Sequence, residues 1–516
     1  MVQIKKYTPA IISVLLMYMV LCIIYPHYQY YVDPDGTAYL TIARRYATGD
    51  YHTAINGYWS PWSCWLTALL IKMGIADIPA SVVINTVGAT GFLLVSQSFF
   101  LKFKVVDKLQ WVLCATLSLF LCYAIFWQSF DDLWECFFLL MIMRIMVQDG
   151  YKYKPALWVA CGVLGALAYF AKAYSFPFFI LNTVCCTYYI SIENKKHWLR
   201  ISAVSIVVMA LCSLPWIYLL HIRYSIWTTS TAGPLNMSWY LVGHPYWKPG
   251  TGMLIPPAYT GSPYYWEDPY VANGITPHFW DSAHLLGLQV LRILFNLIKF
   301  LKSMLQLSAL FPVIGMIAVI SLRAKFGIFG GKVKLLIFTS LLFPLGYVLI
   351  NFEARYLWYI LPLGMTLCAL LIQSLAEGKW KRVMLFVFPL TFLCYPVWCM
   401  CTMYDVGKKE YQWAQQLKKN HIQGGFASYS HEGASVQATV RLAYFSGCSY
   451  YINQNNADLS AFIKEMHRYH IRYYIGCTPS SMSKYILEAL NDEHGGNPYP
   501  EVRMGDDNLF VLQVDL

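Results

Sequence analysis

Two groups of carboxylates stand beside apolar segments of this sequence. Asp33 and Asp35 follow the first apolar segment, and Asp131 and Asp132 lie between the third and the fourth. An ionisable group at a membrane boundary is costly and is a functional candidate by default, and paired acids suit proton transfer. The alternative is a structural role, because Asp-Pro-Asp-Gly forms turns and Asp is a preferred helix cap.

Two cations are expected at the same level of the membrane as these acids. Lys172 lies where the fifth apolar segment ends, and Arg355 lies between the ninth and the tenth. Cations beside carboxylates suit the stabilisation of a departing phosphate. The alternatives are that Lys172 extends to the lipid head groups and that Arg355 forms a local ion pair with Glu353.

A long loop, 222–284, contains further polar candidates. His244 is a candidate for substrate binding. The residues that could include metal ligands are His244, Lys248, Glu267, Asp268, His278, Asp281 and His284, and the last three are spaced so that they fall near one helical face. No known metal signature is present, so no cofactor is expected, although a divalent metal is not excluded. The many Trp and Tyr residues of this loop form either an interfacial belt or a surface on which sugar rings stack.

The composition identifies the class of protein. Of 516 residues, 58% are hydrophobic, 17% aromatic and only 13% charged, and the mean hydropathy is +0.45. These values exclude a soluble globular chain, a disordered chain, collagen and a coiled coil. The net charge of +11 comes from basic residues in short loops between apolar segments, which argues against nucleic acid as a partner.

The elements that must position these side chains are membrane helices. A window of about 19 residues finds apolar segments at 9–25, 79–101, 109–128, 133–149, 156–172, 175–193, 199–221, 304–322, 334–350, 356–375 and 383–403. The fold class predicted is therefore mainly α: a polytopic membrane protein with about 11 transmembrane helices.

Lys and Arg residues alternate between the loops in a way that predicts orientation. The basic loops fall on one side of the membrane, which places the N-terminus in the cytoplasm and the C-terminal segment outside. The outer side then receives loop 26–78, with helices expected near 36–47 and 61–75, and loop 222–284. An amphipathic stretch, 285–303, leads from the second loop into the next span.

The C-terminal segment differs in composition from the rest. Residues 404–516 alternate helix-like runs (406–419, 433–446, 457–469, 479–492) with strand-like runs (425–430, 449–453, 471–476, 501–504, 508–514). This alternation predicts a small parallel or mixed sheet with flanking helices. We therefore divide the chain into a transmembrane body, 1–403, and an extracytoplasmic α/β domain, 404–516.

Several stretches, taken in order, resemble a known family. They are Asp35-Gly36-Thr37-Ala38-Tyr39-Leu40-Thr41-Ile42-Ala43-Arg44, Gly49-Asp50, Trp59-Ser60-Pro61, the pair Asp131 and Asp132, Ala171-Lys172, and Arg355-Tyr356 before Pro362. The set resembles the motifs of GT-C glycosyltransferases, in the branch that contains protein O-mannosyltransferases and lipid A aminoarabinose transferases. The sequence departs from that branch at Gly36, where many relatives carry Glu.

The resemblance implies a function. It implies transfer of a sugar from a polyprenyl-phosphate donor to a lipid, glycan or protein acceptor, at the outer face of a bacterial inner membrane. Asp35 would be the general base, and Asp33 would orient it or replace the acid missing at position 36. Substrate binding would involve Asp131, Asp132, Lys172, Arg355, Tyr39 and His244.

Two other classes of protein remain as alternatives. A transporter or flippase of lipid-linked sugars would need polar residues at mid-depth, broken helices or an internal repeat, and no convincing repeat is present. An assembly factor for envelope polysaccharide would leave the acids unexplained. Acids gathered in one shared cavity favour the transferase, whereas acids scattered as helix caps favour the alternatives.

Overall fold

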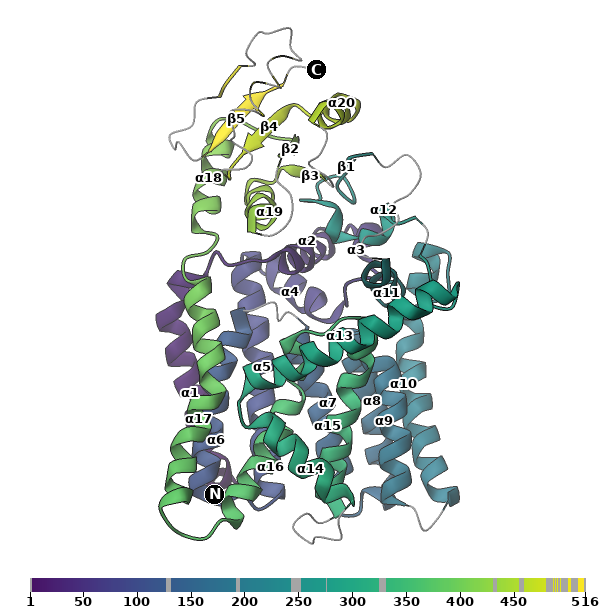
Figure 1. Cartoon of the computed structure of the whole chain (residues 1–516), viewed down its shortest axis with the longest axis vertical. Coiled ribbons are helices and arrows are strands. Elements are labelled where there is room, and N and C mark those ends of the chain that lie inside the picture. Colours follow the sequence, from purple (N-terminus) through teal and green to yellow (C-terminus); the bar gives the residue numbers. More distant parts are fainter. Residues whose placement is uncertain are drawn as a thin grey trace.

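The computed structural model describes residues 2–126, 131–191, 195–242, 252–274, 276–323, 331–429, 434–453, 459–478, 500–502 and 509–514, together with Ile486, Glu488, Leu490 and Asp492. Long helices form a bundle, and a layer of short helices and a small sheet lie on one end of it (Figure 1). We call this end the tail end, because the C-terminal segment lies there. The N-terminus lies at the opposite end of the bundle.

Each apolar segment predicted as a span coincides with a helix of the bundle. These helices are α1 (Val2–Tyr28), α5 (Asp77–Lys102), α6 (Asp107–Phe126), α7 (Asp132–Met146), α8 (Pro155–Ala171), α9 (Ser175–Ile190), α10 (Lys195–Tyr224), α14 (Phe311–Arg323), α15 (Gly331–Ile350), α16 (Ile360–Ser374) and α17 (Lys379–Met403). The prediction of a multi-pass, mainly helical membrane protein is confirmed.

Helix length separates two kinds of span. Among the described residues, 7 helices are long and apolar enough to cross a membrane alone: α1, α5, α6, α10, α15, α17 and α13 (Ala283–Leu307). Two of the shorter helices, α7 and α16, have most of their residues buried in the bundle. A helix needs about 20 apolar residues to cross the hydrocarbon layer alone.

Helix α13 runs obliquely across the bundle near its tail end (Figure 1). Its outer face is apolar and exposed, while its inner face donates hydrogen bonds to the last carbonyls of α15. Gln289 donates to Leu349 O (2.6 Å), and Asn296 donates to Val348 O (2.9 Å) and Ile350 O (3.1 Å). These carbonyls have no partner within their own helix, so side-chain amides fix α13 to α15.

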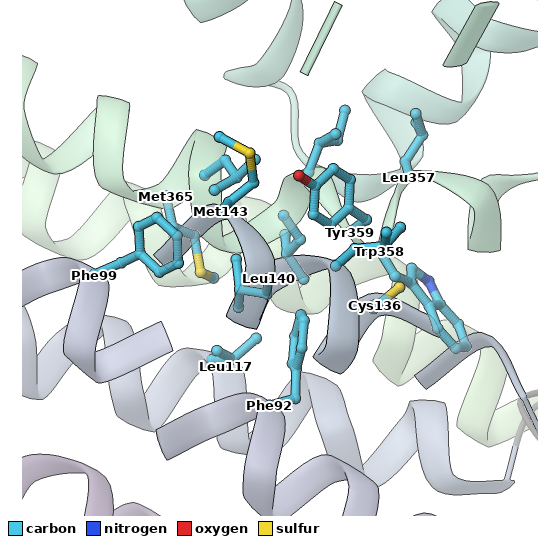
Figure 2. Packing of buried hydrophobic residues seen from close by; sticks show 14 of the residues in the cluster. Phe92, Phe99, Leu117, Cys136, Leu140, Met143, Leu357, Trp358, Tyr359 and Met365 are labelled. Carbon is cyan, nitrogen blue, oxygen red and sulfur yellow. The ribbon is translucent and has the colours of Figure 1, made fainter. Parts of the chain in front are cut away.

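The centre of the bundle is a close-packed apolar core. Side chains from α5, α6 and α7 meet the segment that joins η3 (Ala354–Leu357) to α16, and Figure 2 shows Phe92, Leu140 and Trp358 among them. Trp358 and Tyr359 are almost fully buried. This packing holds the start of α7 and the η3 turn, and so their polar residues, at fixed positions at the tail end.

A layer of short helices covers the tail end of the bundle. It consists of α2 (Pro34–Thr48), α3 (Tyr51–Ala54), α4 (Trp62–Lys72), α11 (Ala232–Val242), η2 (Tyr265–Glu267) and α12 (Pro269–Ala272). Gly49 ends α2 at a φ of 87°, which a residue with a Cβ adopts only with strain. Helices α2 and α4 confirm the two helices expected in loop 26–78.

The C-terminal segment forms a mixed sheet with helices beside it, as expected. The strands lie in the order β1 (Leu254–Ile255), β3 (Ser449–Asn453), β2 (Gly425–Ala427), β4 (Tyr473–Gly476) and β5 (Phe510–Gln513), and the helices are α18 (Lys408–Lys419), α19 (Ala434–Ser446) and α20 (Leu459–Arg468). Strands β2, β3 and β4 are parallel, and β1 and β5 are antiparallel to their neighbours. Strand β1 was not predicted, because it comes from loop 222–284.

Candidate functional site

Asp35 lies in the first turn of α2, where the local sequence fixes its position. Pro34 occupies the first helical position, for which its ring is preorganised. The carboxylate of Asp35 accepts a hydrogen bond from Trp266 Nε1 at Oδ1 (3.1 Å) and one from Arg355 Nη2 at Oδ2 (3.2 Å). Its side chain remains 21% exposed. Asp35 is therefore oriented by two donors and accessible.

Asp33 has a different position from Asp35. Its Oδ1 accepts a hydrogen bond from Gly36 N (2.6 Å), and Thr37 Oγ1 donates to its carbonyl (2.9 Å). Asp33 is thus the N-cap of α2 and is buried, with only 4% of the residue exposed. The capping interpretation of the sequence fits Asp33, whereas it does not account for the two contacts of Asp35.

Arg355 connects carboxylates that are far apart in the sequence. Besides Asp35, its Nη1 lies 3.5 Å from Asp132 Oδ2, and its Nε lies 3.0 Å from Glu353 Oε2. Lys172 Nζ also donates to Asp132, and it lies 4.5 Å from the centre of the Tyr356 ring. The local pair with Glu353 was expected from the sequence, but the contacts with the other two carboxylates were not.

We call Asp35, Asp132, Lys172, Glu353 and Arg355 the Arg355 cluster. Its two cations face three carboxylates, which gives a formal charge of −1. Asp132 is the most buried of the three acids at 7% exposure of the side chain, and Glu353 is the most exposed at 35%. An entering anion would therefore displace Glu353 most easily.

Asp131 and Tyr39 lie beside the cluster. Asp131 accepts a hydrogen bond from Ser63 N (3.0 Å), and so it caps α4 instead of its own helix. Tyr39 follows Asp35 by one helical turn. Burial raises the pKa of the Tyr39 phenol well above its usual value, and the nearby carboxylates of Asp131, Asp132 and Asp35 add to the rise. Tyr39 is thus a neutral phenol at ordinary pH.

A cavity of about 270 Å³ borders the Arg355 cluster. It is lined by residues of α6, α13, α17 and the η3 turn, namely Tyr123, Lys299, Lys302, Ser303, Gln306, Phe352, Glu353, Ala354, Arg355 and Tyr395. Lys299 Nζ donates to Asn351 Oδ1 (3.0 Å), and Asn351 Nδ2 donates to Glu353 Oε1 (3.2 Å). Neither lysine belongs to the motifs identified in the sequence.

A second group of charges also includes a residue of α2, and we call it the Arg45 brace: Arg45, Asp50, Glu267 and Asp268. Arg45 forms an ion pair with Glu267 and donates from Nη1 to Asp50 (2.9 Å). Asp268 accepts from Tyr224 (2.8 Å) and from Tyr259. Burial raises the pKa of Glu267, and Arg45 opposes the rise. Burial likewise raises the pKa of Asp268, and the phenol hydrogen bonds oppose it.

The described residues do not bring three or more His, Cys, Asp or Glu side chains together as a metal site. His278 Nδ1 lies 3.6 Å from Asp281 Oδ2, and these two form a local pair. In the Arg355 cluster, Arg355 and Lys172 stand between the carboxylates, so this donor set does not fit a metal ion. His244 lies outside the described residues.

Comparison with known proteins addresses the fold. No family model and no curated protein matches the sequence. The oligosaccharyltransferase of Archaeoglobus fulgidus, in complex with Zn and sulfate, matches over 91% of this chain and 67% of its own, with a TM-score of 0.53 and 11% identity. ArnT from Cupriavidus metallidurans, bound to undecaprenyl phosphate, matches over 97% of both chains, with a TM-score of 0.57 and 13% identity.

This chain has the GT-C fold. The fold expectation drawn from the ordered motifs is confirmed. Within the GT-C fold, the motif residues Asp35, Asp132, Lys172 and Arg355 come together in one cluster, with Tyr39 beside it. Trp266 and Glu353, which contact the cluster residues directly, lie outside those motifs. The crowding of aromatic residues in loop 222–284 was the only sequence signal for Trp266.

Proposed function

We propose that this chain transfers a sugar from a polyprenyl-phosphate donor to an acceptor at the outer face of the membrane. The observation that carries the proposal is Arg355, which joins Asp35 to Asp132 and also lines the cavity that contains Lys299 and Lys302. A base beside a cationic cavity suits displacement at a phosphate-linked sugar. The binding of undecaprenyl phosphate by ArnT, which has the same fold, supports this class of donor.

In the proposed reaction, one part of the cluster removes a proton from the acceptor and another part stabilises the departing phosphate. Asp35 takes the proton from a hydroxyl or amino group of the acceptor. The acceptor oxygen or nitrogen forms a bond to the anomeric carbon while the bond from that carbon to the phosphate oxygen breaks. The lipid phosphate leaves with the electron pair, and its growing negative charge is met by Arg355 and the cavity lysines.

The donor phosphate enters, in this proposal, from the cavity. Lys302 is exposed and Lys299 is half-buried on the inner side of α13. Glu353 is the carboxylate that the phosphate displaces from Arg355, because it is the most exposed acid of the cluster. Lys172 pairs with Asp132, and its positive charge also favours the negative charge of the phosphate.

The outer-face assignment rests on the alternation of basic residues, which predicts a cytoplasmic N-terminus and an external tail end. A bacterial inner membrane is the proposed location. The tail-end layer covers the cluster, since Trp266 contacts Asp35. This cover fits a lid that excludes water during transfer. His244 belongs to the same loop and remains a proposed substrate contact.

The experiment uses purified protein in lipid nanodiscs with a panel of radiolabelled polyprenyl-phosphate sugars, and it measures release of free lipid phosphate. We expect release that depends on added acceptor and on Asp35. A flippase would move label across the bilayer without breaking the sugar–phosphate bond. Transbilayer movement without release would therefore favour the transporter. The cluster joins the first turn of α2, the start of α7 and the end of α8, and α2 lies at the tail end of the bundle (Figure 1), which supports the transferase.

A further inference from the structure

A continuous hydrogen-bonded path leads from the C-terminal sheet toward Asp35. Strand β1 pairs with β3, with Leu254 opposite Asn453 and Ile255 opposite Ile452. Further along the same segment, the carbonyls of residues 262 and 263 accept from β3: Ser449 Oγ donates to Ser262 O (2.8 Å), and Tyr450 N donates to Pro263 O (2.7 Å). Strand β3 therefore holds this segment at two places, residues 254–255 and residues 262–263.

The next residues of this segment contact the first turn of α2. Tyr264 donates from its hydroxyl to Pro34 O (3.0 Å), and Trp266 donates from Nε1 to Asp35 Oδ1 (3.1 Å). The segment thus bonds to two successive residues of α2. The carbonyl of Trp266 in turn accepts from Trp59 Nε1 (2.8 Å), which fixes the backbone that carries the indole.

The Arg45 brace attaches residues 262–267 to the same helix, α2. Arg45 of α2 pairs with Glu267, which is 0% exposed, and its Nη2 donates to Ser262 Oγ (3.0 Å). Asn56 donates to the carbonyl of Glu267 (2.7 Å). The indole of Trp266 is therefore held from the sheet, from α2 and from the first loop, and it is not free to follow a moving Asp35.

We infer that Trp266 is a positioning residue for Asp35 and that the C-terminal sheet sets its position. This inference rests on the proposed function. Arg355 fixes only Oδ2, and a carboxylate held at one oxygen can still rotate about its χ2 angle. The second donor, at Oδ1, stops that rotation, so that the carboxylate faces the acceptor in one orientation. A loss of orientation at the base lowers turnover and leaves donor binding intact.

The test compares W266F with W280F in the lipid-phosphate release assay. W266F removes the N–H group and keeps an aromatic ring, so we expect kcat to fall about 10-fold, as for loss of a hydrogen bond to a charged group. Donor KM should not change. This split, with kcat lowered and donor KM unchanged, is the sign of a misoriented base. W280F makes the same change at a 63% exposed position and should resemble the wild type.

A second variant, S449A, tests the role of the sheet and does not alter the indole. It removes the Ser449 donor to Ser262 O, and we expect kcat to fall roughly twofold with donor KM unchanged. If W266F does not fold, S449A still decides the outcome. An unchanged kcat in S449A would remove the sheet from the inference.

The remaining outcomes separate this inference from the proposed function. An unchanged kcat in W266F, with D35N inactive, would reject the role of Trp266 and keep the transferase. Full activity in both W266F and D35N would reject both proposals. Equal loss of donor binding and thermal stability in W266F, with kcat unchanged at saturating donor, would make Trp266 a structural residue and would overturn the inference.

Discussion

The Arg45 brace and the Arg355 cluster each include a residue of α2, but they differ in how far their carboxylates are exposed. In the brace, Glu267 and Asp268 are 0% exposed, and cations or phenols contact both carboxylates. In the cluster, the side chains of Asp35 and Glu353 remain 21% and 35% exposed beside a cavity. Burial closes Glu267 and Asp268 to ligands, so these two carboxylates hold structure. The cluster keeps acids and a cation within reach of a substrate.

The comparison predicts the largest effect at Asp35. D35N keeps the size of the side chain and removes its basicity, so turnover should fall about 10²–10⁴-fold, the usual effect of losing a general base. Thermal stability should change little. D33N is the matched control, because Asn caps helices as well as Asp does, and its activity should stay near that of the wild type. An inactive D33N with an active D35N would exchange the two roles.

A substitution in the Arg45 brace should lower the stability of the protein and not its turnover. R45M leaves Glu267 buried without its cation, and breaking a buried pair in this way costs about 3–5 kcal/mol. We expect a lower melting temperature, measured by thermal unfolding in detergent. The double variant R45M/E267Q should recover much of the loss. A stable but inactive R45M would show that the brace takes part in the reaction.

The same variant has a pH dependence with a definite sign. Burial raises the pKa of Glu267 in the folded protein, and Arg45 limits the rise. In R45M the pKa of Glu267 rises further in the folded state. Ionisation of Glu267 therefore destabilises the folded state as the pH increases past the usual pKa of Glu. The melting temperature of R45M should therefore fall between pH 5 and pH 8 more steeply than that of the wild type, on the order of a few degrees. R45M/E267Q should lack this slope.

Donor affinity should respond to the cavity lysines. K299Q and K302Q each remove a charge that faces the cavity, and donor KM should rise about tenfold for each, the effect expected of a partly exposed contact with phosphate. The melting temperature should not change. K409Q alters an exposed lysine of α18 that does not line the cavity and is the control. Unchanged donor KM in both cavity variants would move the phosphate elsewhere.

The smallest effect is expected at Glu353, where donor KM should fall, whereas it rises in the lysine variants. E353Q removes the carboxylate that competes with phosphate for Arg355, so donor KM should fall roughly threefold. Binding of undecaprenyl phosphate, measured by native mass spectrometry, should tighten in parallel. Weaker binding in E353Q would mean that Glu353 supports Arg355 and does not compete with the donor.

The fold was predictable because its signals are local. About 20 consecutive residues are enough to identify a membrane span. The α/β alternation of 404–516 is identified from still shorter consecutive runs. Asp35, Asp132, Lys172 and Arg355 were found because the motif order resembles a known fold. Trp266, β1 and the pairing of Arg355 with Asp35 were not predictable, since each depends on contacts between distant segments that leave no periodic pattern.

The bond between Arg355 and Asp35 also has a consequence for the order in which the chain is completed. It joins residues that are 320 positions apart, so Asp35 leaves the ribosome long before its partner exists. At about 5–20 residues per second, the delay is roughly 15 to 60 seconds. Asp132 and Lys172 are separated by only 40 positions and can neutralise each other early. Membrane insertion can therefore proceed before Asp35 has its cation, and the Arg355 cluster is completed last.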